Sequence, residues 1–172
     1  MSSETFVSAM LLITGVVAAA ILIVAVLPVI WGMVGTFSSA SAATDRSMRT
    51  DYKIVTTYAD YSTGTVNGAY VTVWLKNIGT ARIGTAELSG ADVYVGKTDN
   101  FVRSTRGTVS RNTASYWAYV LYDLGTGNNV WEPGETLQID TFTDEITAVN
   151  QVVYFQFTLP SGVSRSAEFT AV

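Results

Sequence analysis

The sequence predicts an all-β immunoglobulin-like sandwich of about 7–8 antiparallel strands, preceded by one long N-terminal hydrophobic α-helix. Residues 5–44 carry no Asp, Glu, Lys or Arg, and this stretch is longer than the about 20 apolar residues that cross a bilayer. After Asp45, short runs rich in Thr, Val, Tyr and Phe are separated by Gly, Asn and Pro, which is typical of half-buried strands. We therefore expect a transmembrane and stalk helix over residues 1–48 and a sandwich over residues 49–172.

The segment 6–34 is predicted to cross a membrane as a helix, because backbone groups find no water partners in the hydrocarbon layer. Its hydroxyl side chains on Ser8 and Thr14 can bond back to the helix backbone. Pro28 is expected to kink the helix without ending it, and Trp31 follows where an interfacial aromatic residue is typical. The side chains expected to span the membrane are Phe6, Leu11, Leu12, Ile13, Val16, Ile21, Leu22, Val24 and Leu27.

The residues after this span predict a helical stalk. Residues 35–43 read GTFSSASAA and are uncharged and, apart from Phe37, small. A helix that persists over residues 4–48 extends about 65 Å, so roughly half of it projects beyond the bilayer. Small residues such as Gly15, Ala18, Gly32 and Gly35 allow neighbouring helices to approach closely. The upper half of the helix is surrounded either by lipid or by sister helices, and the sequence leaves both alternatives open.

Cleavage as a secretory signal peptide is the alternative to a retained anchor. Ala40-Ser41-Ala42 satisfies the A-x-A cleavage pattern. However, no positively charged region precedes the apolar stretch, and that stretch exceeds the usual length of about 7–15 residues. A basic pilin-type leader is not visible either. We therefore expect a retained anchor.

The charges beside the helix bear on its orientation. Arg46, Arg49 and Lys53 follow the helix, and the positive-inside rule applied to them alone puts the sandwich in the cytoplasm. A long stalk moves these charges away from the interface, and folded domains translocate largely regardless of charge. Charge alone therefore leaves the topology open.

Alternation of apolar and polar residues predicts the strands and their buried faces. We expect strands over residues 51–58, 69–77, 88–95, 116–123, 136–142, 151–159 and 163–170, with no helix of consequence among them. Turns are expected at 62–64, 67–68, 125–128, 132–134 and 160–162, where Gly, Asn and Pro gather. The side chains predicted to face the core are Val71, Val73, Leu75, Leu137, Ile139, Val153, Phe155 and Phe157.

Composition excludes most kinds of chemistry. The chain has no Cys and no His, so thiol nucleophiles, Cys-based zinc sites and Ser-His-Asp triads are ruled out. Its net charge of −4 with scattered cations does not suit nucleic acid. The carboxylates at 132/135 and 140/144/145 match no calcium loop, and we expect them to be solvated turn charges. We predict no enzyme, catalytic residue, metal, cofactor or small-molecule substrate.

The segment 116–122, YWAYVLY, breaks the alternation because it is apolar on both faces. A central strand under a covering loop would explain this. Alternatively, one face packs on the core and the other on a neighbouring subunit, where Tyr and Trp are favoured. The second interpretation makes Tyr116, Ala118, Val120 and Tyr122 a candidate assembly interface.

Several stretches together resemble the archaellar FlaG (ArlG) family. The opening SSETFVSAMLLITGVVAAAILIVAVLPVIWGM and the following TDRSMRTDYKIVTTYAD carry the resemblance most strongly. VWLKNIGTARIG, ELSGADVYVG, WEPGETLQI and the final YFQFTLPSGVSRSAEF are similar to the sandwich domain shared by FlaG, FlaF and archaellins. The resemblance extends over essentially the whole chain.

The resemblance implies a non-enzymatic component of the archaellum, the rotary swimming filament of archaea. It implies a single-pass protein in the archaeal cell membrane, with its sandwich in the pseudo-periplasmic space. There the sandwich would associate with itself or with a FlaF-like partner and link the motor to the S-layer as a stator. The alternative is a filament-forming archaellin or type IV pilin-like subunit, and a ligand-binding sensor or adhesion ectodomain is a further possibility.

Overall fold

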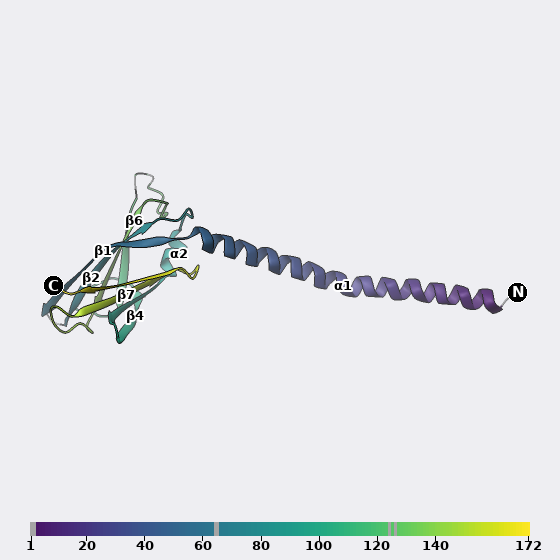
Figure 1. Cartoon of the computed structure of the whole chain (residues 1–172), viewed down its shortest axis with the longest axis horizontal. Helices are drawn as coiled ribbons and strands as arrows, with labels where there is room; N and C mark the ends of the chain where they lie inside the picture. Colours follow the sequence, from purple (N-terminus) through teal and green to yellow (C-terminus); the bar gives the residue numbers. More distant parts are fainter. Residues whose placement is uncertain (1–2, 64–65, 124, 126) are drawn as a thin grey trace. The chain divides into compact units, whose positions relative to one another are not determined.

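The structure, a computed structural model, describes residues 3–63, 66–123, 125 and 127–172. It confirms the predicted fold class: one long helix is followed by a β-sandwich (Figure 1). The chain divides into two compact units between Thr44 and Asp45, so the last turn of the long helix belongs to the same unit as the strands. We call residues 45–172 the head. The elements are α1 (Ser3–Arg49), β1 (Tyr52–Thr63), β2 (Asn67–Asn77), α2 (Thr85–Ser89), β3 (Asp92–Lys97), β4 (Asn100–Arg106), β5 (Tyr116–Tyr122), β6 (Thr136–Thr143), β7 (Val152–Thr158) and β8 (Ser164–Thr170).

Helix α1 is continuous over 47 residues and runs through Pro28. Hydroxyl groups along it donate to the backbone carbonyl four residues earlier, as Thr14 does to Met10 at 2.8 Å. Because the hydroxyl is paired within its own helix, it adds little polarity to the apolar helix surface. This confirms the expectation for Thr14. The same bond is made by Thr36 to Gly32, Ser39 to Gly35 and Thr44 to Ala40.

The described residues form eight strands, which are hydrogen-bonded in the order β1-β2-β6-β5-β4-β3-β7-β8 and fold into two facing sheets that are nearly closed into a barrel. Strands β1, β2, β6 and β5 form the first sheet, and β4, β3, β7 and β8 form the second. A parallel pairing of Thr105 and Arg106 with Tyr116 and Trp117 joins β4 to β5, a departure from the antiparallel prediction. At the other edge Val172 exchanges backbone hydrogen bonds of 2.9 Å with β1.

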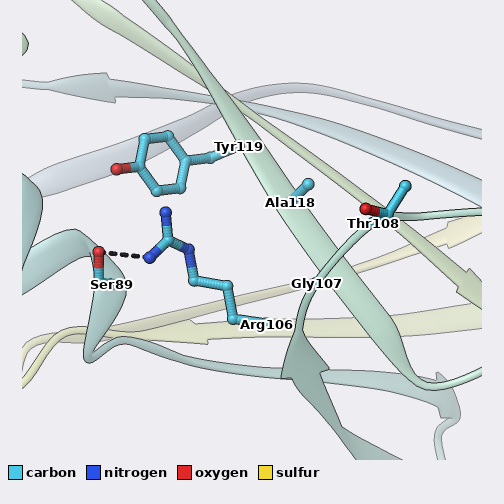
Figure 2. Close-up of a pocket in the computed structure, with 6 residues that line it drawn as sticks. All are labelled: Ser89, Arg106, Gly107, Thr108, Ala118 and Tyr119. Atoms are coloured by element: carbon cyan, nitrogen blue, oxygen red, sulfur yellow. Dashed lines mark hydrogen bonds between the residues drawn. The ribbon is translucent and has the colours of Figure 1, made fainter.

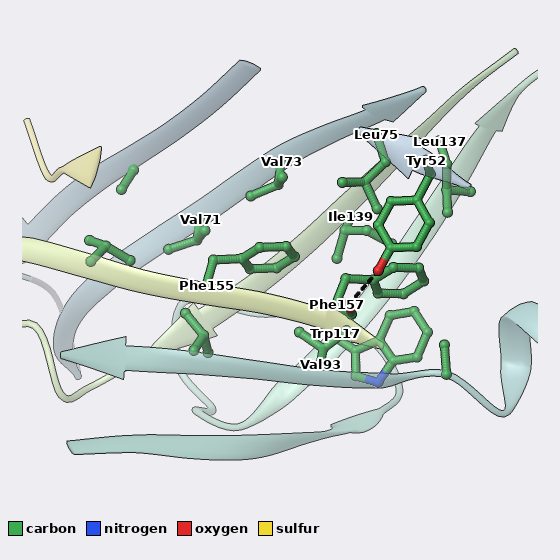
Figure 3. Packing of buried hydrophobic residues seen from close by; sticks show 14 of the residues in the cluster. Tyr52, Val71, Val73, Leu75, Val93, Trp117, Leu137, Ile139, Phe155 and Phe157 are labelled. Carbon is green, nitrogen blue, oxygen red and sulfur yellow. Dashed lines mark hydrogen bonds between the residues drawn. The ribbon is translucent and has the colours of Figure 1, made fainter. Parts of the chain in front are cut away.

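The core lies between the sheets, where the predicted inward side chains meet (Figure 3). All of these predictions are confirmed, because each side chain is fully buried: Val71, Val73, Leu75, Leu137, Ile139, Val153, Phe155 and Phe157. Trp117 of β5 joins them, and its ring packs edge-on against Phe157 at 6.2 Å. Large aromatic and branched side chains from both sheets therefore fill the core.

Tyr52 crosses the core from the first residue of β1. Its hydroxyl donates to the backbone carbonyl of Phe157 on the opposite sheet, as the dashed line in Figure 3 shows. Its ring centroid lies 5.8 Å from that of Trp131. Burial raises the pKa of Tyr52 above its usual value, because ionisation would place a charge in a low-dielectric core. Tyr52 therefore links the two sheets.

The end of α1 is held by the loop that follows β2. The backbone carbonyl of Arg49 accepts from Thr80 at 2.9 Å and from Ala81 at 3.1 Å, and that of Asp51 accepts from Gly79 at 2.9 Å. The two bonds to Arg49 satisfy a carbonyl that the helix end leaves unpaired. The sequence KNIGTARIG thus contributes the C-terminal cap of the helix.

Residues of the KNIGTARIG segment and of the WEPGE segment (131–135) form a buried polar network beside this cap. The Asn77 amide donates at 3.0 Å to the carbonyls of both Ala81 and Trp131. The Trp131 indole donates to the Glu135 carbonyl at 2.9 Å. The Glu135 carboxylate accepts from the Glu132 backbone at 2.9 Å, and the residue is only 2% exposed. The expectation of a solvated charge at Glu135 is therefore wrong, because this carboxylate caps a buried turn.

The strand predicted over residues 88–95 is wrong in its first half. Residues Thr85–Ser89 form α2, and the strand β3 begins at Asp92. Leu88 belongs to α2 and its side chain is buried. In the sequence a buried leucine of a short helix looks the same as an inward-facing leucine of a strand. The strand β4 was missed because six of its seven residues are exposed and only Ser104 is buried. Its pairing with β3 defines it, and alternation does not.

Two predicted turns also need correction. Asn67 and Gly68 lie in β2, and Ser62 and Thr63 lie in β1, while Gly64 and Thr126 lie outside the described residues. A Cβ on Gly68 would lie 2.3 Å from the Thr143 carbonyl. This glycine is thus required by the close approach of β6 and not by a turn.

Candidate assembly site

The side chains of α1 are exposed throughout the described apolar stretch. The nine predicted membrane-spanning residues are between 44% and 71% exposed: Phe6, Leu11, Leu12, Ile13, Val16, Ile21, Leu22, Val24 and Leu27. The helix is long and apolar enough to cross a membrane. Because so much contiguous apolar surface is unfavourable in water, α1 requires lipid or other helices around it.

The candidate interface residues of β5 share the outward face of the first sheet. Trp117 points into the core and is 1% exposed, whereas Tyr116, Val120 and Tyr122 are 38%, 48% and 50% exposed. Ala118 lies between them on the same face and is partly exposed. The structure therefore brings the four predicted residues together on one strand face, where their role in assembly remains a prediction.

Polar side chains of neighbouring strands form a hydrogen-bonded row beside this face. The Tyr122 hydroxyl donates to Gln138 Oε1 at 2.7 Å. Gln138 Nε2 donates to Asp140 at 2.8 Å and 3.0 Å, and Thr72 Oγ1 donates to Asp140 at 2.8 Å. The row crosses β5, β6 and β2. It was not predicted, because only the strand order brings these residues together.

One end of the outward face is covered by the segment between β4 and β5. Arg111 of this segment forms an ion pair of 2.5 Å with Asp60, and its guanidinium carbon lies 5.3 Å from the Tyr70 ring centroid. Phe142 pairs with Tyr70 and with Tyr116 in register and is fully buried. A covering segment thus exists at the Tyr116 end, whereas the face at Val120 and Tyr122 is open.

The edge of β5 opens into a cleft of about 590 Å³ (Figure 2). β5 pairs with β6 along its whole length but with β4 only at Tyr116 and Trp117. Past that point, in the described part of the chain, no strand pairs with this edge. Arg106 lines the cleft: its guanidinium carbon lies 5.1 Å from the Tyr119 ring centroid and its Nη1 donates to Ser89 at 2.6 Å. An unpaired strand edge is a ready place for another strand to pair.

No group of three or more Asp or Glu side chains able to hold a metal ion is present among the described residues. The cleft beside β5 carries no carboxylate in its described lining, which is made by Ser89, Arg106, Gly107, Thr108, Ala118 and Tyr119. The outward face and open edge of β5 offer contact surface and hydrogen-bonding groups, which are the elements of protein association.

The fold and its exposed surfaces define a class of protein with an N-terminal apolar helix and a β-sandwich head. The chain matches no family model. A relative from Archaeoglobus fulgidus, described as an uncharacterized protein, is 25% identical over 171 residues, which is 99% of each chain. The alignment therefore extends over both the helix and the head of this chain.

Two solved structures of archaellum proteins share this fold. The archaellum periplasmic stator protein FlaG from Sulfolobus acidocaldarius aligns with a TM-score of 0.51 and 22% identity, over 70% of this chain and 99% of its own. The archaeal flagellum of Methanospirillum hungatei strain JF1 aligns with a TM-score of 0.63 and 14% identity, over 96% of this chain and 92% of its own.

Proposed function

We propose that this protein is a non-enzymatic, membrane-anchored component of the archaellum whose head assembles with itself or with a FlaF-like partner. The observation that carries the proposal is the union of a 47-residue helix with exposed apolar side chains and a sandwich head. The fold shared with FlaG and the sequence resemblance to the FlaG family support it. In this role the head links the motor to the S-layer as part of a stator.

The helix provides both the anchor and the spacer in this proposal. Its 47 residues correspond to about 70 Å of helix, whereas about 20 residues cross the hydrocarbon layer. The described part of α1 carries its charged residues near its two ends, at Glu4 and from Asp45 onward. The remaining length separates the membrane from the head, which suits a protein that must hold a load outside the lipid.

The orientation of the head in the membrane is a separate part of the proposal. Arg46 pairs with Glu87 at 2.5 Å and Arg49 with Asp45 at 3.0 Å. The positive-inside rule counts cations and not net charge, so these pairs leave the orientation open. The fold shared with the periplasmic stator protein FlaG supports the outward one. We propose that the head lies in the pseudo-periplasmic space. Protease added to intact spheroplasts is expected to digest the head, and full protection of the head would contradict this orientation.

The open end of the β5 face is the proposed assembly surface. Val120 and Tyr122 are exposed there next to an unpaired strand edge. Tyr and apolar residues at the centre of a contact provide most of its binding energy, and a strand edge adds backbone hydrogen bonds. We therefore expect the contact to include β5 of one head and a strand of another head or of a FlaF-like partner.

Lysine substitutions test this surface. The full-length variants Val120→Lys and Tyr122→Lys, purified in detergent, are expected to lose head assembly in analytical ultracentrifugation and to fail to retain a FlaF-like partner. Both should unfold at the wild-type temperature, since the replaced side chains are exposed. Val149→Lys, at a residue 53% exposed outside the strands, is the matched control. Wild-type assembly by both β5 variants would refute the proposed surface.

A filament subunit is the second candidate. The alignment with the archaeal flagellum extends over 96% of this chain and therefore includes most of α1. Gly15, Gly32 and Gly35 leave open space on the helix surface, since a Cβ there would meet nothing within 4 Å. Helices with such small residues can pack closely in a filament core.

Cell fractionation combined with intact mass measurement separates the two candidates. A chain of full mass beginning at Met1 and retained in membranes is expected for the anchored component. A shortened chain recovered mainly in sheared filaments would instead support the filament subunit and overturn the stator proposal.

A further inference from the structure

The outward face of the second sheet carries an aromatic cluster. The rings of Phe101 from β4 and Tyr154 from β7 lie with centroids 4.8 Å apart at an angle of 35°. Tyr94 from β3 meets Phe101 edge-on, with centroids 6.2 Å apart at 88°. Phe101 is 45% exposed. Three strands thus place aromatic surface in contact with solvent.

Gly96 explains how rings from two strands that are not neighbours meet. It pairs with Phe101 on one side and with Tyr154 on the other. A Cβ at this position would lie 2.4 Å from the Asn100 carbonyl and 2.7 Å from Phe101 Cα, and the backbone φ is +155°. A side chain here would be strained and would also stand between the two rings. The glycine is therefore needed to build the cluster.

A groove of about 190 Å³ lies beside the cluster, with aromatic residues and polar residues in its wall. In register, Tyr94 lies opposite Gln156 and Asp92 lies opposite Thr158. The groove is too small for most drug-sized ligands, which occupy roughly 300–1,000 Å³. Its lining is Asp92, Tyr94, Phe101, Gln156 and Thr158.

Hydrogen bonds fix the polar side chains of the groove in place. The Tyr154 hydroxyl donates to Gln156 Oε1 at 2.6 Å, and Gln156 Nε2 donates to Thr158 Oγ1 at 3.2 Å. Arg103 donates from Nε at 2.8 Å and from Nη2 at 2.5 Å, both to Asp92 Oδ1. Among the described residues these bonds do not use Asp92 Oδ2 or the second amide N–H of Gln156, so the groove wall still offers one acceptor and one donor.

We propose that this groove binds a neutral pyranose ring of a surface glycan. The C–H face of a pyranose carries slight positive charge and packs on the negative face of an aromatic ring. Its hydroxyl groups both donate and accept, which matches an acceptor on Asp92 and a donor on Gln156. The groove has room for one sugar ring. Its polar side chains are already held in place by hydrogen bonds, so little conformational freedom is lost on binding.

The charges of the groove favour a neutral ligand. The carboxylate of Asp92 is paired with the guanidinium of Arg103, so each charge is already neutralised by the other. Neither an anionic nor a cationic ligand would therefore meet an unpaired opposite charge from this pair. The groove and the β5 face belong to different sheets. The inference therefore stands apart from the proposed assembly role, and either can fail without the other.

Saturation-transfer NMR on the full chain in a sugar-free detergent tests the inference. The probes are methyl α-D-mannopyranoside, methyl β-D-glucopyranoside and methyl β-D-galactopyranoside. We expect transfer to the ring C–H protons of at least one probe. Phe101→Ala and Gln156→Leu should weaken the affinity for that probe roughly three- to tenfold, by losing the aromatic contact or the hydrogen bond. Tyr58→Ala, which removes an aromatic residue that is 49% exposed on β1 of the first sheet, should bind as the wild type does.

Absence of transfer to all three probes would overturn the inference. Equal affinity in wild type and Gln156→Leu would also overturn it, provided that the variant unfolds at the wild-type temperature. Gln156→Leu keeps the size of a partly exposed side chain, so it separates lost binding from lost folding if Phe101→Ala is unstable.

Discussion

Helix α1 and the head use the same kinds of apolar side chain in opposite ways. Val16 and Val24 of α1 are 62% and 71% exposed, whereas Val71 and Val73 of β2 are fully buried. The head therefore contains the apolar contacts that stabilise it, while α1 depends on what surrounds it. Substitutions in the two regions should fail in different ways: one set should change the free energy of unfolding, and the other should change where the protein is found.

Phe157→Ala is expected to have the largest effect on the head. The Phe157 ring packs against Tyr52 at 5.5 Å and against Trp117 at 6.2 Å, and it is fully buried. Deleting it leaves a cavity between the sheets, which should lower the free energy of unfolding by about 3–5 kcal/mol. Denaturant unfolding followed by tryptophan fluorescence measures this. Tyr58→Ala, at a residue that is 49% exposed on β1, should change it by less than about 0.5 kcal/mol. A loss below about 1 kcal/mol in Phe157→Ala would contradict the core described above.

Val16→Lys tests the other region. A lysine near the centre of a membrane helix costs about 2.5–3.5 kcal/mol, so the fraction of protein that resists carbonate extraction from membranes should fall. The unfolding of the head should not change, because Val16 lies outside the head. Ser39→Lys, beyond the predicted span, is the control and should leave extraction unchanged. If Val16→Lys destabilises the head and leaves extraction unchanged, the contrast between the two regions is wrong.

The same contrast explains how much of the fold the sequence predicts. Alternation marks the boundary between core and solvent, so the inward faces of β2, β6 and β7 were predicted residue by residue, and the uncharged stretch predicted α1. Strand β4 has almost no buried side chain, so its sequence does not record its pairing with β3. Leu88 is buried from a helix of five residues, too short to show a helical period.

The candidate site was predicted only in part, for a related reason. The outward residues of β5 follow from one strand read alone. Their polar partners, Gln138 on β6 and Thr72 on β2, depend on a strand order in which β2 lies next to β6. Likewise, the open edge of β5 depends on where β4 departs from it. Such pairings between distant segments are set by the closed arrangement of the two sheets and not by local pattern.

Tyr52→Phe should have an intermediate effect, confined to the head. It removes the hydroxyl that bonds to the Phe157 carbonyl across the core and keeps the ring. The free energy of unfolding should fall by about 1–2 kcal/mol, the contribution of a buried hydrogen bond. Chemical denaturation at neutral pH measures this, with Tyr122→Phe as the exposed control. An unchanged free energy would show that the bond does not link the sheets.

The same substitution should change the pH dependence of stability. Burial raises the pKa of Tyr52 in the folded state, while the unfolded chain releases this proton near pH 10. The stabilising difference is complete below about pH 10. Above it the unfolded state binds fewer protons than the folded state, so stability falls as the pH rises. The fall between about pH 10 and 11 should be smaller in Tyr52→Phe than in wild type. Parallel curves for the two proteins would contradict the assignment.

The ion pair between Arg46 and Glu87 should have the smallest effect. It connects the last turn of α1 to α2 at 2.5 Å, but the Arg46 side chain is 60% exposed, so solvent screens the attraction. A double-mutant cycle with Arg46→Ala and Glu87→Gln should give a coupling of less than about 1 kcal/mol, and added salt should reduce it further. The helix end should stay attached to the head even without this pair, because the Arg49 carbonyl keeps its bonds to Thr80 and Ala81. A coupling above about 2 kcal/mol would mean that the ion pair, and not these backbone bonds, holds the end of α1.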